Sequence, residues 1–196
     1  MLYDCFTFYN ELDVLEIRLN YLNDLVDKFV IVEMDKTFSG IEKPFVFEEN
    51  KNRYKKFLNK ITYIKVKCNA NETNLSDYEK CWYRENYQRD CIMQGLNNAK
   101  DDDIIIISDA DEIPSKIAIQ CYSSGITALG QMMMYYYLNN LNIIDPMWTR
   151  GSKICHFSDL INPQVEIPLQ FGMKYTKKGL PTYIRFCNKN LVTSGG

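Results

Sequence analysis

The chain has 196 residues, of which 46% are hydrophobic and 24% are charged, as in an ordinary globular protein with one core. Its formal net charge of -2 argues against the basic surface that nucleic-acid binding requires. Seven cysteines occur at wide spacings without a CxxC pair, beside a single histidine. A zinc site of cysteine and histidine is therefore not expected. We expect the cysteines to be free thiols in a reducing compartment.

The sequence predicts a cytoplasmic protein without a transmembrane segment. Met1 is followed by a strand-like stretch that contains Asp4 and Asn10, whereas a signal peptide would need a basic and then an apolar segment. No apolar run approaches the length of a membrane span. We expect any contact with a membrane to be peripheral and to depend on recruitment by other proteins.

The first part of the chain alternates between strand and helix patterns. Buried strands are predicted over residues 2–8, 28–33 and 61–66. Leucines recur at helical spacing behind Asn10, a favourable N-cap, and predict an amphipathic helix that ends near Leu25. A short helix is expected around residues 50–59. The order strand, helix, strand requires a right-handed parallel crossover, so we expect an α/β fold.

A longer helix is predicted from Ser76 to about Asn98, because Ser76 and Glu79 form a capping-box pattern. The inward stripe of this helix is apolar in its second half but polar at its start. A crossover helix runs antiparallel to the strand that follows it, so the polar start should lie at the carboxyl end of that strand. The residues expected in the crevice there are Arg84, Glu85, Gln88 and Arg89. The alternative for the two arginines is that they are solvated charges on the helix surface.

Four consecutive isoleucines at residues 104–107 predict a short strand buried on both faces, as in a parallel sheet. Asp109, Asp111 and Glu112 follow directly. Ligands of open α/β sheets bind outside the carboxyl ends of the strands, and residues two apart in extended chain point the same way. Asp109 and Asp111 therefore suit Mg²⁺ or Mn²⁺ that carries a phosphate group. The alternative is an acidic turn that only ends the strand.

Beyond residue 114 the alternation of strands and helices stops. The pattern predicts a short helix at 115–122, turns at 123–130, a strand at 131–141, a loop or strand edge near 148–153 and a last strand at 183–187. We expect these segments to form antiparallel strands and loops laid against the first sheet. No linker, repeat or low-complexity segment divides the chain, so a single domain over residues 1–196 is predicted.

Four blocks of this sequence, in the same order, resemble the family 17 glycosyltransferases. They are YDCFTFYNELDVLEIRL from Tyr3, VDKFVIVEMDKTFSG from Val26, WYRENYQRD from Trp82 and DDDIIIISDADEIP from Asp101. The resemblance implies a GT-A fold, with a Rossmann-like, mostly parallel sheet flanked by helices and an antiparallel C-terminal part. It also implies Mn²⁺ or Mg²⁺, a UDP-sugar donor, a glycan or glycoconjugate acceptor and inversion at the anomeric carbon. Residues 1–114 would bind the nucleotide, and residues 115–196 would form the acceptor side.

The resemblance also implies roles for individual residues. Asp111 would be the main metal ligand, and Asp109 would contact the metal or the ribose. Asp109, Asp111 and Glu112 form the expected catalytic group. The expected donor-binding residues are Thr7, Asn10, Glu11, Glu33, Arg84, Glu85, Gln88, Arg89 and Asp109.

An inverting transfer needs a base that takes the proton of the acceptor hydroxyl. Besides Glu112, the candidates are Asp145, His156, Asp159 and Glu166, none of which stands out. Members of the family continue past a Gly pair, whereas the sequence ends at Gly195 and Gly196. We therefore expect the acceptor side and the base to be missing or supplied differently.

Three hypotheses follow. The first is a metal-dependent inverting glycosyltransferase that moves N-acetylglucosamine or another hexose from a UDP-sugar to a glycan. The second is a phosphatase or phosphotransferase of the haloacid-dehalogenase type, which also places DxD after an apolar strand, although on an early strand. The third is a truncated, catalytically silent relative that binds a nucleotide or a glycan.

Overall fold

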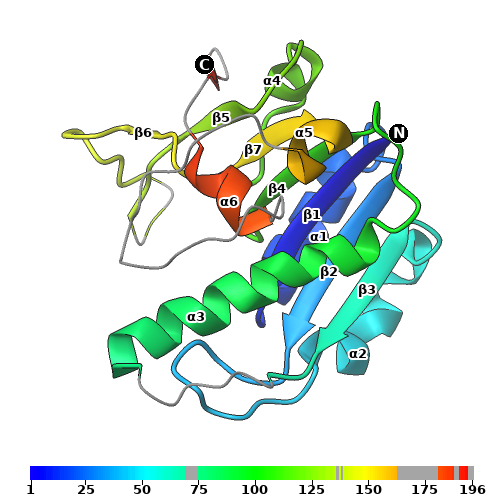
Figure 1. Cartoon of the computed structure of the whole chain (residues 1–196), viewed down its shortest axis with the longest axis vertical. Coiled ribbons are helices and arrows are strands. Elements are labelled where there is room, and N and C mark those ends of the chain that lie inside the picture. Colours follow the sequence, from blue (N-terminus) through cyan, green and yellow to red (C-terminus); the bar gives the residue numbers. More distant parts are fainter. Residues whose placement is uncertain (69–74, 136, 138, 163–180, 188–189, 194–196) are drawn as a thin grey trace.

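The computed structural model describes the chain except for residues 69–74, 136, 138, 163–180, 188–189 and 194–196. One mixed sheet runs through the described residues, in the strand order β3-β2-β1-β4-β7-β5-β6, with β8 paired to β5 (Figure 1). Its parallel half consists of β1 Leu2–Phe8, β2 Lys28–Met34, β3 Ile61–Val66 and β4 Ile104–Asp109. These strands confirm the predicted α/β fold with a parallel core.

Helices cover both faces of the parallel half. α3, Asp77–Asp90, crosses one face, and α1, Leu12–Leu22, lies behind the sheet in the same view (Figure 1). α1 contributes buried leucines to one core cluster, and the 3₁₀ turn Cys91–Gly95 after α3 contributes Ile92 to the other. The layered arrangement is that expected of a GT-A-like fold. No helix among the described residues is long and apolar enough to cross a membrane.

The boundaries of three helices differ from the predicted ones, and α1 ends at Leu22 instead of near Leu25. α1 starts after Glu11, not Asn10, and the Glu11 carboxylate accepts the backbone N–H of Asn10 at 3.0 Å. The predicted helix at 50–59 is α2, Val46–Asn50, followed by a 3₁₀ turn, Lys51–Phe57.

The capping box at Ser76 is confirmed, but α3 ends at Asp90 instead of near Asn98. The 3₁₀ turn that follows packs closely on β2, because a Cβ on Gly95 would lie 2.3 Å from Val30 Cγ1. Close packing of this turn against the sheet replaces the last helical turns that the sequence pattern predicts.

The second half of the chain extends the sheet beyond β4 with antiparallel pairs. β7, Lys153–His156, pairs antiparallel with β4, and β5, Thr127–Met132, pairs with β7 and with β6, Met147–Trp148. β8, Asn190–Thr193, runs parallel to β5. Two short helices, α4 Lys116–Gln120 and α5 Phe157–Ile161, complete this half.

Two predictions for this half are wrong. β5 begins at Thr127, inside the predicted turn region, and ends at Met132, so it overlaps little with the predicted strand at 131–141. The predicted strand at 183–187 is instead the helix α6, Pro181–Phe186. Its β-branched and aromatic residues favour a strand, but proline fits the first turn of a helix, and Ile184 is buried in the core on the α3 side.

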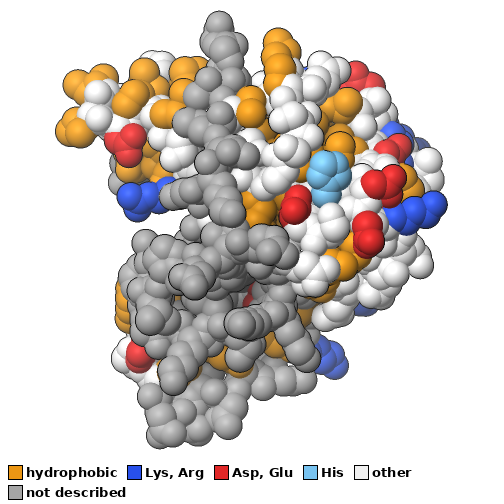
Figure 2. Space-filling view, turned by 45° about the horizontal axis from the view of Figure 1, so that its top comes forward, with side chains coloured by type: hydrophobic (Ala, Val, Ile, Leu, Met, Phe, Trp, Pro, Cys, Tyr) orange, Lys and Arg blue, Asp and Glu red, His pale blue; other side chains and the backbone are white. Residues whose placement is uncertain are grey.

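The segment around β6 projects from the body of the protein (Figure 1). In Figure 2, hydrophobic side chains gather on this projecting segment. Two of its residues, Ile143 and Ile144, are 87% and 92% exposed. All seven cysteines lie in the described part of the chain and are free thiols.

Candidate functional site

A buried arginine forms hydrogen bonds with the backbone of the turn that follows β4. Arg18 on α1 donates hydrogen bonds to the carbonyl oxygens of Asp109, Ala110 and Glu112 at 2.8, 3.2 and 3.3 Å. Its guanidinium also bonds both carboxylate oxygens of Asp4 on β1, at 2.8 and 2.6 Å, and neither side chain is exposed. The charge of Arg18 is thereby balanced, and the turn is fixed to two elements of the parallel half.

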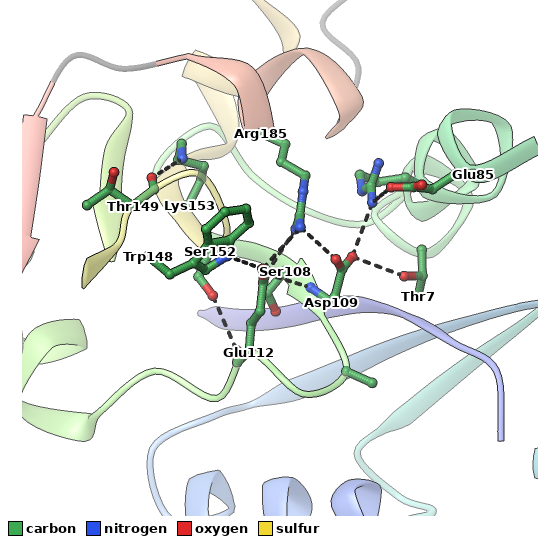
Figure 3. Close-up of polar contacts among 12 residues, drawn as sticks. Thr7, Glu85, Ser108, Asp109, Glu112, Trp148, Thr149, Ser152, Lys153 and Arg185 are labelled. Carbon is green, nitrogen blue, oxygen red and sulfur yellow. Dashed lines mark hydrogen bonds and ion pairs between the residues drawn. The ribbon is translucent and has the colours of Figure 1, made fainter. Parts of the chain in front are cut away.

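The Asp109 carboxylate is occupied by two arginines. Arg89 on α3 lies 3.1 Å from Oδ1, and Arg185 on α6 lies 2.6 Å from Oδ2. The Thr7 hydroxyl donates a longer bond of 3.4 Å to Oδ1 (Figure 3). Burial disfavours the charged carboxylate, but the two guanidinium groups outweigh burial and lower the pKa of Asp109 below its ordinary value.

The Glu112 carboxylate also stabilises the turn through hydrogen bonds. It accepts the Trp148 indole N–H at 2.6 Å and two bonds from Arg185 at 2.9 and 3.0 Å (Figure 3). It also accepts the backbone N–H of Asp109 at 3.0 Å. The backbone of Gly151 passes so close that a Cβ there would lie 2.3 Å from Glu112 Oε1. Glu112 is therefore fully engaged in holding the turn.

Asp111 differs from its two acidic neighbours. Its side chain is exposed, and no described residue forms an ion pair with it in the structure. Partial burial, followed by the nearby charges of Glu112 and Asp109, raises the pKa of its carboxyl group. Asp111 is thus the carboxylate of this turn that is available to a ligand.

A pocket of about 510 Å³ opens at the carboxyl ends of the parallel strands, beside Asp111. Five of the predicted site residues line it: Thr7, Glu11, Gln88, Asp109 and Asp111. The opposite wall is the segment that follows β2, which no sequence pattern indicates as part of the site. Its lining residues are Lys36, Thr37, Phe38, Ser39, Ile41 and Lys43.

Gln88 and Arg84 show why the start of α3 is polar and buried. The Gln88 amide donates to the carbonyl oxygens of Phe8 and Val32, at 3.2 and 2.8 Å, where β1 and β2 end. Arg84 donates to the carbonyl oxygen of Phe38 at 2.7 Å and so holds the wall after β2. Of the four residues predicted to share this crevice, Gln88 lines the pocket. Arg84 bonds the pocket wall, and Arg89 pairs with Glu85 and Asp109.

Like Arg84 and Arg89, three further predicted donor residues do not line the pocket. Glu33 is buried, and its carboxylate accepts Lys43 Nζ at 2.5 Å, the Tyr63 hydroxyl at 2.7 Å and the first backbone N–H groups of α2. Glu85 pairs with Arg89 at 2.7 Å, and Asn10 is exposed beside the start of α1. In this structure, Glu33 and Glu85 make contacts that stabilise the walls around the site.

The base candidates do not gather around Asp111. His156 pairs with Ile104, the first residue of β4, so it lies at the sheet edge opposite Asp109, and Asp159 is 3.9 Å from it. Asp145 is exposed in the segment before β6, and Glu166 lies outside the described residues. Glu112 is the candidate at the site, although Arg185 and Trp148 occupy its carboxylate.

Sequence reasoning missed three residues that shape the site. Arg185 is separated from Asp109 by more than seventy residues, as the hydrogen bond between them records. Arg18 and Asp4 stand within apolar patterns, where a charge is easily taken for the exposed side of the element. The sequence did contain an indication of these residues, because each charge interrupts a helix face or a strand that is otherwise apolar and buried. A charge that is buried in this way requires an oppositely charged or hydrogen-bonding partner.

The profile of glycosyltransferase family 17 matches residues 1–151. The chain belongs to glycosyltransferase family 17. The matched residues include β1 to β4, the turn with Asp109 and Asp111, and the Trp148 contact, whereas Arg185 lies outside them.

Curated relatives match a shorter part of the chain. The β-1,4-mannosyl-glycoprotein 4-β-N-acetylglucosaminyltransferases of Homo sapiens and Rattus norvegicus are each 30% identical over 113 residues. That of Mus musculus is 29% identical over 113 residues. The aligned region covers 55% of this chain and 20% of each relative, so the alignment spans about a fifth of the length of those proteins.

Proposed function

We propose that this chain transfers a sugar from a UDP-sugar to a glycan, with inversion at the anomeric carbon. The observation that carries the proposal is the pocket at the carboxyl ends of β1 and β4, with Asp111 at its edge. Nucleotides bind at this place in open α/β sheets. Membership of glycosyltransferase family 17 supports a sugar nucleotide, and the names of the relatives favour N-acetylglucosamine and a glycoprotein glycan.

The pocket offers complementary groups for a nucleoside diphosphate. The aromatic and apolar side chains of Tyr9, Phe38 and Ile41 suit a base, and Lys36 lies among them. Thr7 and Asp111 stand at the end nearest β4, where the sugar-bearing phosphate would approach the acidic turn. We infer that the nucleotide lies between the segment after β2 and the turn after β4.

The acidic turn fits a divalent cation through one carboxylate. Among the described residues no group of three or more cysteine, histidine, aspartate and glutamate side chains surrounds a common point. Asp109 offers no free oxygen, whereas Asp111 does, and Mg²⁺ or Mn²⁺ is commonly held by one or two carboxylates together with substrate phosphates. A cation bound there would offset the negative charge that develops on the leaving diphosphate. Asp111 would hold it, and Arg18 would keep Asp111 in place through the turn backbone.

Calorimetric titration of UDP, with and without Mn²⁺, tests this proposal. We expect UDP to bind only with Mn²⁺, and Asp111→Asn to weaken that binding by about tenfold or more, because a charged ligand to the cation is lost. Asp159→Asn, at the opposite sheet edge, is the matched control and should bind like the wild type. UDP binding that is indifferent to Mn²⁺ and to Asp111 would contradict the proposal.

A catalytically silent nucleotide-binding relative is the second candidate, because the carboxylate of Glu112 is occupied by Arg185 and Trp148. The two candidates share the pocket and differ in turnover. Release of UDP from UDP-N-acetylglucosamine with Mn²⁺ present, lost in Asp111→Asn, would establish turnover. Metal-dependent UDP binding without any release of UDP, with acceptor glycans added, would favour the silent relative.

A further inference from the structure

Arg185 is positioned rigidly over the acidic turn. It stands on α6, where Thr182 donates its backbone N–H to Asp90 at 3.0 Å and its hydroxyl to the Asn86 carbonyl at 3.1 Å. These bonds fasten α6 to α3, and Ile184 is fully buried beside them. The Arg185 side chain is 8% exposed, so its guanidinium is held against the turn and largely removed from solvent.

The guanidinium of Arg185 bridges the two carboxylates on either side of Asp111. Nη2 lies 2.6 Å from Asp109 Oδ2 and 3.0 Å from Glu112 Oε1, and Nη1 lies 2.9 Å from Glu112 Oε2 (Figure 3). With Arg89 on Asp109 Oδ1 and Trp148 on Glu112 Oε1, the oxygens of both carboxylates have donors. A cation that bridged Asp109 and Asp111 would need an oxygen of the Asp109 carboxylate. The guanidinium of Arg185 already occupies that carboxylate.

We propose that Arg185 is a positioning residue that blocks Asp109 as a metal ligand, so that a divalent cation binds through Asp111, weakly when alone and tightly only together with the nucleotide diphosphate. This inference rests on the proposed function and adds to it the coupling between metal and donor. A single partly exposed carboxylate binds Mn²⁺ weakly, since this class of ion needs several oxygen ligands. The phosphate oxygens of the donor supply the others, so metal and nucleotide each raise the affinity for the other by the same factor.

The test is the affinity for Mn²⁺ alone, without nucleotide, measured by calorimetry or by the electron paramagnetic resonance signal of free Mn²⁺. Arg185→Gln keeps a hydrogen-bonding side chain but removes the charge, which frees Asp109 Oδ2. We expect Mn²⁺ to bind this variant on the order of tenfold more tightly than the wild type, because a second carboxylate becomes available. Urea unfolding of Arg185→Gln checks that the variant folds cooperatively like the wild type, so that the Mn²⁺ affinity is compared between folded proteins.

Two further variants identify the carboxylate responsible. Arg185→Gln combined with Asp109→Asn should return the Mn²⁺ affinity to the wild-type value, since the freed oxygen is then no longer charged. Arg53→Gln removes the same charge from an exposed cluster with Asp13 and Glu16, and should leave Mn²⁺ affinity unchanged. An equal gain in Arg53→Gln, or a double variant that stays tight, would overturn the proposal.

Arg185→Lys covers the case in which Arg185→Gln does not fold. One ammonium group cannot bond both carboxylates as the planar guanidinium does, so an intermediate gain in Mn²⁺ affinity is expected. Mn²⁺ affinity that is unchanged or lower in every folded Arg185 variant refutes the role of Arg185. These titrations contain no nucleotide, so they are independent of the UDP titrations that test the proposed function.

Discussion

At the scale of single residues, charged groups buried beneath the site give the turn its shape. Arg18 lies on the Phe6 ring, with 4.3 Å from its guanidinium carbon to the ring centre, and none of its side chain is exposed. Its bonds to Asp4 and to three turn carbonyls satisfy a charge that would otherwise be costly to bury. The position of Asp111 in the pocket therefore depends on a fully buried residue that does not line the pocket.

Replacing Arg18 by methionine tests this dependence. The variant leaves Asp4 buried without its partner, so the free energy of unfolding should fall by about 3–5 kcal/mol, as is usual when a buried ion pair loses one member. Arg53→Met is the control, because Arg53 pairs with Asp13 and Glu16 at the surface and should cost less than about 1 kcal/mol. Urea unfolding of both variants measures the difference, and similar losses would contradict the importance of burial.

Lys153 is a second buried charge near the site, with its amine 2.9 Å from the carbonyl oxygen of Thr149. Burial, and then the charge of Arg185, lower the pKa of Lys153 to about 8, although Glu112 acts in the opposite direction. A lysine whose pKa is lower in the folded state takes up a proton on unfolding between pH 8 and its ordinary pKa of 10.5. Stability therefore rises with pH across that window, and below it the buried charge destabilises the fold.

The variant Lys153→Met isolates this contribution. Since methionine does not titrate, the free energy of unfolding of the wild type minus that of the variant should rise between pH 8 and 10.5, by on the order of 1–3 kcal/mol. Taking the difference cancels the tyrosines and cysteines that titrate in the same range. Urea titrations at several pH values provide the measurement, and a difference that stays flat with pH would show that Lys153 keeps an ordinary pKa.

At the scale of elements, the parallel half could be predicted from sequence and much of the rest could not. β1 to β4 and the cap of α3 were predictable, because buried strands and a capping box are local patterns. The same patterns predicted the polar residues of α3, since a polar start to a buried stripe requires partners. α6 and the Arg185 contact were not predictable, because they depend on packing between segments far apart in the chain.

The approach of β6 and β7 to the acidic turn is a further tertiary feature. Gly151 lies between Trp148 and Glu112, and a Cβ there would be 2.3 Å from Glu112 Oε1 and from Trp148 Nε1. Gly151→Ala should therefore push Glu112 away, lower stability by about 1–3 kcal/mol and weaken Mn²⁺-dependent UDP binding. Calorimetry and urea unfolding measure the two effects.

Gly95→Ala is the control for the Gly151 variant, because it creates a comparable clash with Val30 in the core, where the 3₁₀ turn after α3 packs on β2. It should lower stability while leaving the affinity of the folded protein for UDP and Mn²⁺ unchanged. If both variants lose UDP affinity equally, the contact among Gly151, Trp148 and Glu112 has no specific influence on the site.

At the scale of the whole molecule, the two edges of the parallel sheet have different chemistry. The carboxyl ends of the strands hold the pocket and the acidic turn. The opposite edge holds the Met1 amine paired with Asp103 at 2.6 Å, and His156, whose Nδ1 lies 3.0 Å from the Tyr122 hydroxyl. Since β4 spans the distance between the edges, a ligand at the pocket cannot contact His156.

This polarity predicts where ligand binding protects the backbone. On addition of UDP and Mn²⁺, amide hydrogen exchange should slow in the segment after β2 and in the turn after β4, because these line the pocket. Exchange in β7 near His156 and in α5 should not change, and His156→Ala should bind UDP and Mn²⁺ like the wild type. Protection at both edges, or loss of binding in His156→Ala, would show that the ligand reaches the opposite edge or that the two edges are coupled through the sheet. A response confined to the pocket edge would place donor binding there and leave any acceptor base to be sought near Asp111, not at His156.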